Sequence, residues 1–516
     1  MSLFYSLTDH LDFHAQVRGD TLLASDDKQT LNFAEAKRRV DRIAGAMEAS
    51  GLGAGDRVGI LAKNSVDNLC TFLACARLGV VAVGLNYRLT QPEVEFIAND
   101  AEIKHLFFDA EFDGLRGDYL RAQPGVCYDA DRAPNFDKWI EQGEPVTDSR
   151  AGGDDVLFQM YTSGTTGLPK GVLITHRNVL LVTYQGPMTT GKGHRVGEKG
   201  LVVAPLFHAV GLVGALMGVI YGGTMIIHRD YDPVGMIDTL EKEQINTTAV
   251  IPVMLQFSII CVPDIAERDF SNLHTINYGA SPIAEDLLRQ CMDIFKCDFI
   301  QGYGQTEATL ALTFLTADDH RAALNDKPQL LRSCGRAVFG TEIRIVDEDG
   351  NTLPTGEIGE IVASGPQLMK GYWKRDDATG KTIVDGWLHT GDAGRMDAEG
   401  YVYIQDRVKD MIISGGENIY PAELENVLMS HPAIQDAAVI GVSDEQWGEV
   451  PLAVLVSTGQ QELTAEDLVA FCRDKLAGYK IPRQLAYVEA LPRNPTGKIL
   501  KKDLREQFRD RMKNTA

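Results

Sequence analysis

The 516-residue sequence has no C-x-x-C pair among its eight cysteines and no regular spacing between them. This argues against a zinc-binding motif and against a disulfide framework, and it suits a reducing compartment such as the cytoplasm. The first residues lack a basic start followed by an apolar run, so we expect no signal peptide. Low-complexity tracts and fixed-period repeats are also missing from the sequence.

Positive charge is scarce, because 50 Lys and Arg stand against 72 Asp and Glu, a formal net charge of −22. Nucleic-acid binders normally carry a basic balance, so we expect no nucleic-acid partner. A composition of 44% hydrophobic and 24% charged residues is ordinary for a globular protein, and the length predicts two to four structural units.

Formally charged residues are absent from 201 to 227, a stretch long enough to span a bilayer. Pro205 and His208 interrupt its first third, and Gly222-Gly223 divide it near the end. We therefore predict a buried helix followed by a buried strand, and no transmembrane segment.

Short apolar strands alternate with helices in two long stretches. The first contains a strand at 57–62, a helix at 66–78 and a strand at 80–85, and the rhythm returns from 200 to 303. Such alternation builds mostly parallel sheets covered by helices. We predict an α/β fold, with a large N-terminal domain of such sheets plus a small β-unit after residue 350, and a small α+β C-terminal domain. The predicted boundaries are 1–406, a hinge at 407–410, and 411–516.

The stretch from Tyr161 to Val172 resembles a phosphate-binding loop and reads Tyr-Thr-Ser-Gly-Thr-Thr-Gly-Leu-Pro-Lys-Gly-Val. Glycines let successive backbone N–H groups point at one anion, hydroxyls add donors, and Lys170 adds a positive charge. The P-loop spacing of common NTPases fails because Pro169 stands where the second glycine must be. A plain surface turn is the alternative for this stretch alone. The predicted phosphate-binding residues are Thr162, Ser163, Gly164, Thr165, Thr166, Gly167 and Lys170.

Four further motifs follow in the sequence. They are Tyr278-Gly-Ala-Ser-Pro282, Gln301-Gly-Tyr-Gly-Gln-Thr-Glu307, Trp387-Leu-His-Thr-Gly-Asp392 and Leu491-Pro-Arg-Asn-Pro-Thr-Gly-Lys498. Together with the loop they resemble, in order, the motifs of the adenylate-forming superfamily, which includes acyl-CoA synthetases, luciferases and adenylation domains of peptide synthetases. The resemblance covers nearly the whole chain, and five ordered motifs are far more specific than one.

The resemblance implies a nucleotide site with ATP and Mg²⁺. In it Tyr303 would stack on adenine, Thr306 would contact the α-phosphate and Glu307 would hold Mg²⁺, a cation that prefers oxygen ligands. Asp392 would accept hydrogen bonds from the ribose hydroxyls, and Arg407 would reach the ribose or a phosphate. The other implied nucleotide-binding residues are Gly279, Ala280, Ser281, Gln301, Gly302 and Gly304. Taken alone, Ser281 could equally cap a helix, and Asp392 and Arg407 could be surface charges.

The resemblance also assigns roles to the C-terminal part of the chain. Lys498 would bridge the attacking carboxylate and the α-phosphate, where a cation stabilises the transition state between two anions. Lys409 would be the hinge of a mobile domain, and coenzyme A would bind at Ser414, Gly415, Gly416 and Glu417. A simple connector is the alternative for this segment. The string from Lys409 to Glu423 is most similar to fatty-acyl-CoA and aryl-CoA ligases.

An acyl pocket is expected at the uncharged stretch, lined by its residues Phe207, Val210, Gly211 and Gly214 and by Tyr278 of the second motif. By resemblance, His208 stands at its mouth as a catalytic residue; as a lone histidine it could equally be a satisfied core residue. An amino-acid-activating domain would want a carboxylate here for the substrate ammonium, and none occurs from 201 to 227. An uncharged chain or ring is therefore favoured.

Together with these observations, the resemblance implies a cytoplasmic, ATP-dependent acyl-CoA synthetase, an AMP-forming acid–thiol ligase. It would convert a fatty or aryl acid to acyl-AMP and then transfer the acyl group to coenzyme A. Its partners would be small molecules, and a homodimer is left open. A luciferase-like adenylating oxygenase and a non-catalytic acyl or nucleotide binder are the alternatives.

Overall fold

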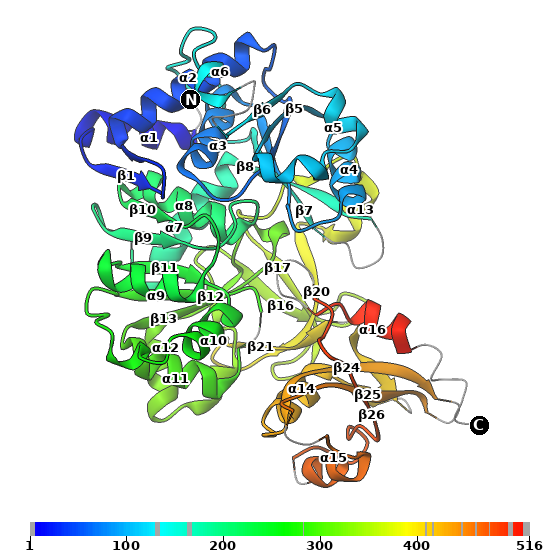
Figure 1. Cartoon of the computed structure of the whole chain (residues 1–516). Coiled ribbons are helices and arrows are strands. Elements are labelled where there is room, and N and C mark those ends of the chain that lie inside the picture. Colours follow the sequence, from blue (N-terminus) through cyan, green and yellow to red (C-terminus); the bar gives the residue numbers. More distant parts are fainter. Residues whose placement is uncertain are drawn as a thin grey trace. The chain divides into compact units, whose positions relative to one another are not determined.

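The chain divides into two compact units, which are drawn in Figure 1. The larger unit comprises Met1–Glu342 and Ala363–Leu388, and the smaller comprises Ile343–Val362 and His389–Ala516. The chain thus leaves the larger unit at Ile343 and returns to it for the segment Ala363–Leu388. The computed structural model describes residues 6–129, 135–162, 168–193, 195–281, 283–407, 410–414, 417–444, 447–459, 462–473, 475–493 and 499–508. The hinge at 407–410 stays a prediction, and residues 408 and 409 lie outside the described residues.

The first sheet of the larger unit is parallel in its centre. In spatial order it contains β15 (Arg336–Ala337), β14 (Thr313–Leu315), β13 (Asp298–Tyr303), β12 (Thr275–Gly279), β11 (Thr247–Val250), β9 (Lys199–Val202), β10 (Thr224–Ile227), β1 (Leu22–Ser25) and β2 (Thr30–Asn32). Neighbours from β13 to β1 pair in parallel, whereas β14, β15 and β2 are antiparallel edges. The carboxyl ends of β12 and β13 therefore lie together at one edge.

The second sheet of the larger unit is also parallel in its centre. Its order is β18 (Gly371–Tyr372), β8 (Lys170–Thr175), β7 (Val156–Thr162), β4 (Val81–Gly84), β3 (Arg57–Leu61), β5 (Ile103–Phe108) and β6 (Gly125–Cys127). Strands β7 to β6 pair in parallel, and β8 and β18 add antiparallel strands at one side. The predicted strands at 57–62 and 80–85 are confirmed within one residue at each end.

Helices pack on these sheets. They are α1 (Leu7–Arg18), α2 (Phe33–Ala49), α3 (Val66–Leu78), α4 (Gln91–Asp100), α5 (Asp118–Ala122), α6 (Phe136–Trp139), α7 (His176–Thr190), α8 (Ala209–Tyr221), α9 (Pro233–Lys242), α10 (Pro252–Cys261), α11 (Glu285–Phe295), α12 (Ala317–Asn325) and α13 (Asp376–Thr382). Short 3₁₀ helices are η1 (Ala110–Leu115), η2 (Ile265–Glu267), η3 (Thr306–Ala308) and η4 (Pro328–Arg332). Asn32 caps α2 reciprocally: its Oδ1 accepts the Glu35 N–H at 2.8 Å, and Glu35 Oε2 accepts the Asn32 N–H at 2.9 Å.

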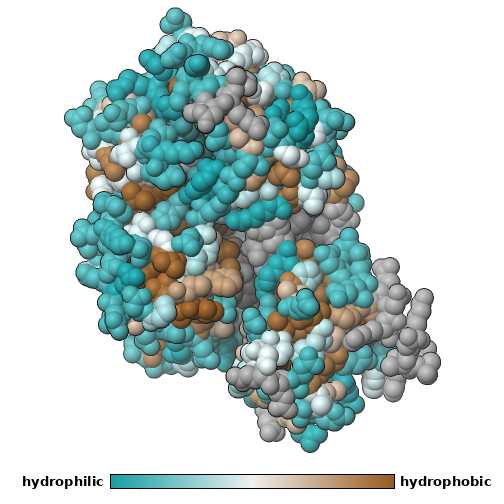
Figure 2. All heavy atoms as spheres, in the orientation of Figure 1, coloured by the Kyte–Doolittle hydropathy of each residue, from teal (hydrophilic) through white to brown (hydrophobic). Residues whose placement is uncertain are grey.

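The hydrophobic core of the larger unit joins residues of both sheets through α2, α3 and α8. Every residue of α3 except Asp67 is buried, and the uncharged stretch forms α8 and β10 as predicted. Each fully buried Leu or Phe contributes about 1.5–3 kcal/mol. Among the described residues, no helix combines the length and apolarity needed to cross a membrane. Hydrophilic residues cover most of the face of this unit drawn in Figure 2, with smaller hydrophobic patches between them.

The described residues of the smaller unit form two sheets. The first has β16 (Glu342–Val346), β17 (Gly359–Ser364) and β20 (Trp387–Met396) in order, with β21 (Val402–Arg407) also paired to β20. The short β19 (Ile383–Val384) pairs with the start of β20. The second sheet has β23 (Glu417–Ile419), β22 (Ile412–Ser414), β25 (Gly448–Ser457) and β24 (Ile434–Asp444), with β26 (Gln484–Tyr487) on β25.

Helices cover both faces of the second of these sheets. Side chains of successive residues along β24 point to opposite faces of the sheet, so neighbouring residues contact different helices. Val439 belongs to the core with α14 (Pro421–Met429) and α15 (Ala465–Cys472), whereas Ile440 belongs to the core with α16 (Lys501–Phe508). The predicted α/β class, with a large domain of parallel sheets and a smaller C-terminal domain, is confirmed.

Candidate active site

The glycine-rich loop is carried by two paired strands. Thr162 at the end of β7 lies directly opposite Lys170 at the start of β8. Ser163, Gly164, Thr165, Thr166 and Gly167 lie outside the described residues. Lys170 Nζ is 4.7 Å from the centre of the Tyr372 ring on the adjacent strand β18, within range of a cation–π contact. The hairpin thus brings a hydroxyl and an ammonium to the two ends of the loop.

Glu307 contacts Thr162 at the start of this loop. It lies in the 3₁₀ helix η3 next to Thr306, and its side chain is 8% exposed. Its Oε1 accepts hydrogen bonds from Thr162 Oγ1 at 3.5 Å and from Tyr372 Oη at 2.7 Å. Two predicted motifs, more than 140 residues apart in sequence, therefore share one contact.

A carboxylate held in this way fits the chemistry of Mg²⁺ binding. Protein sites for Mg²⁺ commonly offer one or two carboxylates, while phosphates and water complete the shell. The described residues contain no group of three or more His, Cys, Asp or Glu side chains arranged around a metal site. Glu307 is thus suited to a cation that arrives with a polyphosphate.

The two predicted adenine motifs lie side by side, because β12 and β13 are neighbours and Gly279 pairs with Gly302. A Cβ at Gly279 would lie 2.3 Å from the Gly302 carbonyl oxygen, so only glycine fits this close approach. Gln301 Oε1 is buried and has no hydrogen-bond partner among the described residues. A buried acceptor without a partner is costly, and a bound ligand would relieve that cost.

Backbone strain occurs in both regions. Ala280 has φ +66° and Thr309, two residues after Glu307, has φ +65°. Non-glycine residues rarely adopt positive φ, and such residues concentrate at functional sites. Ser281 does not cap α11, since the N-cap residue is Ala284. The capping explanation for the first motif is therefore wrong.

His208 is the N-cap residue of α8. Its Nε2 is buried with no hydrogen-bond partner among the described residues. Burial, and secondarily the charge of Arg88, lower the pKa of His208 to about 4. The imidazole is therefore neutral near pH 7 and can accept or donate at a ligand. It is not the fully satisfied core histidine that the sequence also allowed.

Asn64 holds the segment before His208. Its Nδ2 donates to the carbonyl oxygens of Ala204 at 3.0 Å and His228 at 3.1 Å, and its Oδ1 accepts the Leu206 N–H at 2.8 Å. All polar atoms of a nearly fully buried amide are thereby used. This clamp fixes the turn from which α8 starts.

The predicted pocket residues on α8 differ in their surroundings. A Cβ at Gly211 would lie 2.2 Å from the Pro205 carbonyl oxygen, whereas a Cβ at Gly214 would meet nothing within 4 Å. Val210 and Gly214 are half-buried, and Phe207 is buried. Tyr278 is also buried, and its hydroxyl bonds to His320 Nε2 at 2.9 Å on α12. The assignment of these residues to an acyl pocket stays a prediction.

In the smaller unit, Asp392 on β20 lies directly opposite Arg407 on β21, and Asp392 is buried. The two predicted ribose residues are thus cross-strand neighbours. Ser414 pairs with Glu417 in the hairpin of β22 and β23. Lys409, Gly415, Gly416 and Lys498 lie outside the described residues, so their roles also stay predictions.

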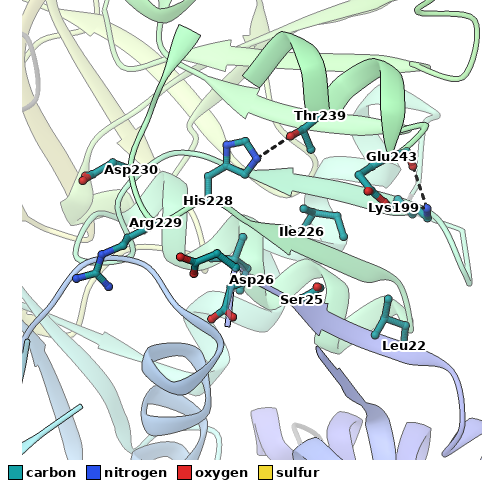
Figure 3. Close-up of a pocket in the computed structure, with 12 residues that line it drawn as sticks. Leu22, Ser25, Asp26, Lys199, Ile226, His228, Arg229, Asp230, Thr239 and Glu243 are labelled. Carbon is teal, nitrogen blue, oxygen red and sulfur yellow. Dashed lines mark hydrogen bonds and ion pairs between the residues drawn. The ribbon is translucent and has the colours of Figure 1, made fainter. Parts of the chain in front are cut away.

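The hollow drawn in Figure 3, about 490 Å³, lies elsewhere in the larger unit. His228 lies beside Thr239 and bonds to its hydroxyl at 2.9 Å, and Lys199 Nζ donates to the carbonyl oxygen of Glu243 at 2.9 Å. Asp230 accepts from Tyr87 at 2.9 Å. These polar side chains bond to one another or to neighbouring residues, and the predicted site residues are not among those that line the hollow.

Residues 11–373 match the sequence pattern of the AMP-binding enzyme family, and residues 423–498 match that of the AMP-binding enzyme C-terminal domain. The chain belongs to the AMP-binding enzyme family. The predicted resemblance to the adenylate-forming superfamily is therefore confirmed.

Similar proteins cover almost the whole chain. Feruloyl-CoA synthase of Amycolatopsis sp is 39% identical over 484 residues, 93% of this chain and 94% of that protein. Fatty acid–acyl-carrier-protein ligase ScoC of Streptomyces coeruleorubidus is 36% identical over 511 residues, 98% of this chain and 96% of that protein. The o-succinylbenzoate CoA synthetase MenE of Bacillus subtilis, solved with its acyl-adenylate intermediate, has a TM-score of 0.86 at 32% identity and covers 96% and 97% of the two chains. MenE has also been solved with ATP and a magnesium ion.

Sequence reasoning missed Tyr372 and Asn64. The Gly-Tyr-Trp string at 371–373 resembles many turn-to-strand passages, and nothing in its spacing links it to Glu307. A single asparagine likewise gives no signal of a clamp. Only the three-dimensional structure joins these residues to the site.

Proposed function

We propose that this protein is an ATP-dependent acyl-CoA synthetase. A carboxylate oxygen of the acid attacks the α-phosphorus of ATP and expels pyrophosphate, which leaves an acyl-adenylate. The thiol of coenzyme A then attacks the acyl carbon and expels AMP. The named relatives bear out this class of AMP-forming ligase, with ATP, Mg²⁺ and coenzyme A as small-molecule partners.

The observation that carries the proposal is the meeting of the loop hairpin with Glu307. Thr162, Lys170 and Glu307 place a hydroxyl, a cation and a metal-binding carboxylate around one region of the larger unit. A polyphosphate with its magnesium needs these three kinds of group. The orphaned Gln301 Oε1 beside the paired Gly279 and Gly302 supports an adenine site at the adjoining strand ends.

The acid is proposed to be an uncharged fatty or aryl chain. Helix α8 carries no charged residue, and Gly214 leaves open space on it. His208 starts this helix with a neutral imidazole, and we assign it to the mouth of the acyl pocket between the carboxylate and the phosphates. A substrate ammonium would have no acidic partner on α8.

Adenine and ribose contacts complete the proposal. Tyr303 stacks on the adenine, Thr306 contacts the α-phosphate, and Asp392 with Arg407 binds the ribose. Lys498 supplies the cation for adenylation, and the loop at Ser414–Glu417 admits the pantetheine arm after the domain rotates at Lys409. The cross-strand pairing of Asp392 with Arg407 supports their common role.

The acceptor thiol has a second candidate. ScoC, which this chain matches over 98% of its length, is named for transfer to an acyl carrier protein. Carrier proteins and coenzyme A present the same pantetheine thiol, so one site could serve either. The relatives named for coenzyme A make it the first choice.

The experiment is a panel of fatty, aryl and amino acids assayed for pyrophosphate release with and without coenzyme A. We expect release with fatty or aryl acids and thioester formation only with coenzyme A present. A parallel arm replaces coenzyme A by a holo acyl carrier protein. Acid-dependent light emission or oxygen uptake without thioester would favour the oxygenase, and absence of pyrophosphate would favour a non-catalytic binder.

We also propose a cytoplasmic location. All eight cysteines are free, and reduced cysteines are typical of the cytosol. The substrates ATP and coenzyme A are intracellular metabolites, which agrees with this location.

A further inference from the structure

We propose that Tyr372 is a positioning residue for the magnesium ligand Glu307, an inference that rests on the proposed function. Its hydroxyl fixes one carboxylate oxygen, Oε1, so that the other, Oε2, is presented to the metal. Tyr372 touches neither the acid nor the nucleotide in this scheme, and it acts only through Glu307.

The hydroxyl contact is short and sheltered. Tyr372 Oη donates to Glu307 Oε1 at 2.7 Å, and the two residues are 6% and 8% exposed. Hydrogen bonds to a charged acceptor are about twice as strong as neutral ones, and low exposure reduces competition from water.

Both described side-chain contacts of Glu307 fall on the same oxygen. Thr162 Oγ1 donates to Oε1 at 3.5 Å, beside the donor from Tyr372. Within the described part of the chain, Oε2 makes no hydrogen bond. A carboxylate anchored through one oxygen has a fixed plane, and its second oxygen is available to a cation.

The backbone around Tyr372 is held as firmly as its hydroxyl. Strand β18 pairs antiparallel with β8, and the Tyr372 N–H donates to Thr379 Oγ1 at 2.9 Å. The Met369 N–H donates to the Glu307 carbonyl oxygen at 2.7 Å. The same short segment therefore grips both the main chain and the side chain of Glu307.

The ring of Tyr372 has a second neighbour in the phosphate loop. Lys170 Nζ lies 4.7 Å from the ring centre, so one aromatic side chain contacts both the candidate metal ligand and the candidate phosphate cation. The strand that carries it comes from Ala363–Leu388, the segment that returns to the larger unit. Replacement by Phe removes the hydroxyl contact and keeps the ring contact, which separates the two effects.

The test measures metal binding directly. Mn²⁺ is titrated by electron paramagnetic resonance into the protein saturated with a non-hydrolysable ATP analogue, in the wild type and in Tyr372→Phe. Loss of a residue that orients a metal ligand typically costs 10–100-fold in metal affinity, and we expect a loss in that range. Binding of the analogue without metal should stay within about twofold.

The control is Tyr403→Phe in the smaller unit. Tyr403 is also 6% exposed, and its hydroxyl donates to the carboxylate of Asp397 at 3.2 Å. This variant deletes the same atom from the same kind of pair, and we expect wild-type Mn²⁺ affinity. Equal losses in both variants would overturn the proposal, since a general loss of stability would then explain them.

A double-mutant cycle decides whether Tyr372 acts through Glu307. Glu307→Gln should weaken Mn²⁺ binding strongly, and adding Tyr372→Phe should cost no more than about twofold further. Additive losses would overturn the positioning role. If Glu307→Gln weakens Mn²⁺ binding but Tyr372→Phe does not, the inference fails and the proposed metal site stands. If Glu307→Gln binds Mn²⁺ normally, the metal site itself is wrong, and the inference falls with it.

If Tyr372→Phe does not fold, a second variant can still test the proposal. Glu307→Asp retains a carboxylate but withdraws it by one methylene from the Tyr372 hydroxyl. We expect a weakening of Mn²⁺ binding of at least 10-fold. Wild-type affinity in Glu307→Asp would show that placement of the carboxylate does not matter, and would overturn the proposal.

Discussion

The Cα of Gly211 packs against the carbonyl oxygen of Pro205 so closely that a Cβ would lie 2.2 Å from that oxygen. Three residues further along α8, Gly214 has open space where its Cβ would be. Two glycines that look alike in the sequence therefore have different surroundings in the structure. The first is required by packing, whereas the second has room for a side chain.

This difference predicts different results for substitutions at Gly211 and Gly214. Gly214→Leu should fold normally and shorten or abolish the accepted acyl chain, because the new side chain fills the open space. Gly211→Ala should lower stability by about 1–3 kcal/mol, the usual cost of overpacking, with little change in acyl preference among the protein that folds. Urea denaturation and an acid panel separate the two. Unchanged chain preference in Gly214→Leu would move the pocket away from this face.

The ribose assignment predicts that Asp392→Ala raises the apparent KM for ATP at least 10-fold, since a buried carboxylate that accepts two hydroxyls is lost. The KM for the acid should change little. Asp349→Ala, at an exposed turn of the same unit, serves as the control and should match the wild type. Pyrophosphate release at varied ATP gives both values. A normal ATP dependence in Asp392→Ala would remove this role.

The two half-reactions should separate at two lysines. Lys498→Ala is expected to lose adenylation by orders of magnitude, yet still convert supplied acyl-adenylate and coenzyme A to thioester. Lys409→Pro, which fixes φ at the predicted hinge, should release pyrophosphate near normally and lose thioester formation. Equal loss of both steps in Lys498→Ala, or of neither step in Lys409→Pro, would contradict domain rotation.

Buried histidines predict a loss of stability on acidification. Burial lowers the pKa of His105 from 6.5 to about 4, so the unfolded chain takes up the proton first. His105 therefore contributes fully above pH 6.5, and its contribution, up to about 3 kcal/mol, is lost as the pH falls through 4. His105→Phe, packed against Phe107 and Trp139, should flatten the dependence of the unfolding free energy between pH 7 and 4.5. A steeper dependence than the wild type would refute this sign.

The sequence predicted the fold class and the order of elements well, because the signals were local. Helix α3 begins and ends at the predicted residues Val66 and Leu78, since an N-cap serine precedes it and a left-handed glycine follows it. Asn32 and Glu35 form the predicted capping box. The uncharged stretch split into helix and strand at Gly222, whose φ of +75° ends α8.

The site could be predicted only as far as its motifs are contiguous in sequence. Thr162 and Glu307 each belong to a motif that can be recognised in the sequence, but their contact depends on the packing of two sheets. The hydrogen bond from Tyr372 depends on strand β18, which a distant segment adds to the sheet. A pattern of hydrophobic residues in the sequence does not indicate such a partner. The crowding of Gly211 comes from the carbonyl oxygens of Ala204 and Pro205, which are near in sequence, but it depends on the turn before α8, which the sequence alone does not show.

The return of Ala363–Leu388 to the larger unit limits how this protein can be divided by genetic engineering. Expression of residues 1–342 alone would expose the edge of β8 that β18 covers, and an open edge strand invites aggregation. A stand-alone larger unit therefore has to extend to residue 388 or carry the returning segment grafted through a short linker in place of residues 343–362. Two-plasmid complementation with a break after 342 should likewise fail, because the returning segment is then made apart from the rest of the larger unit.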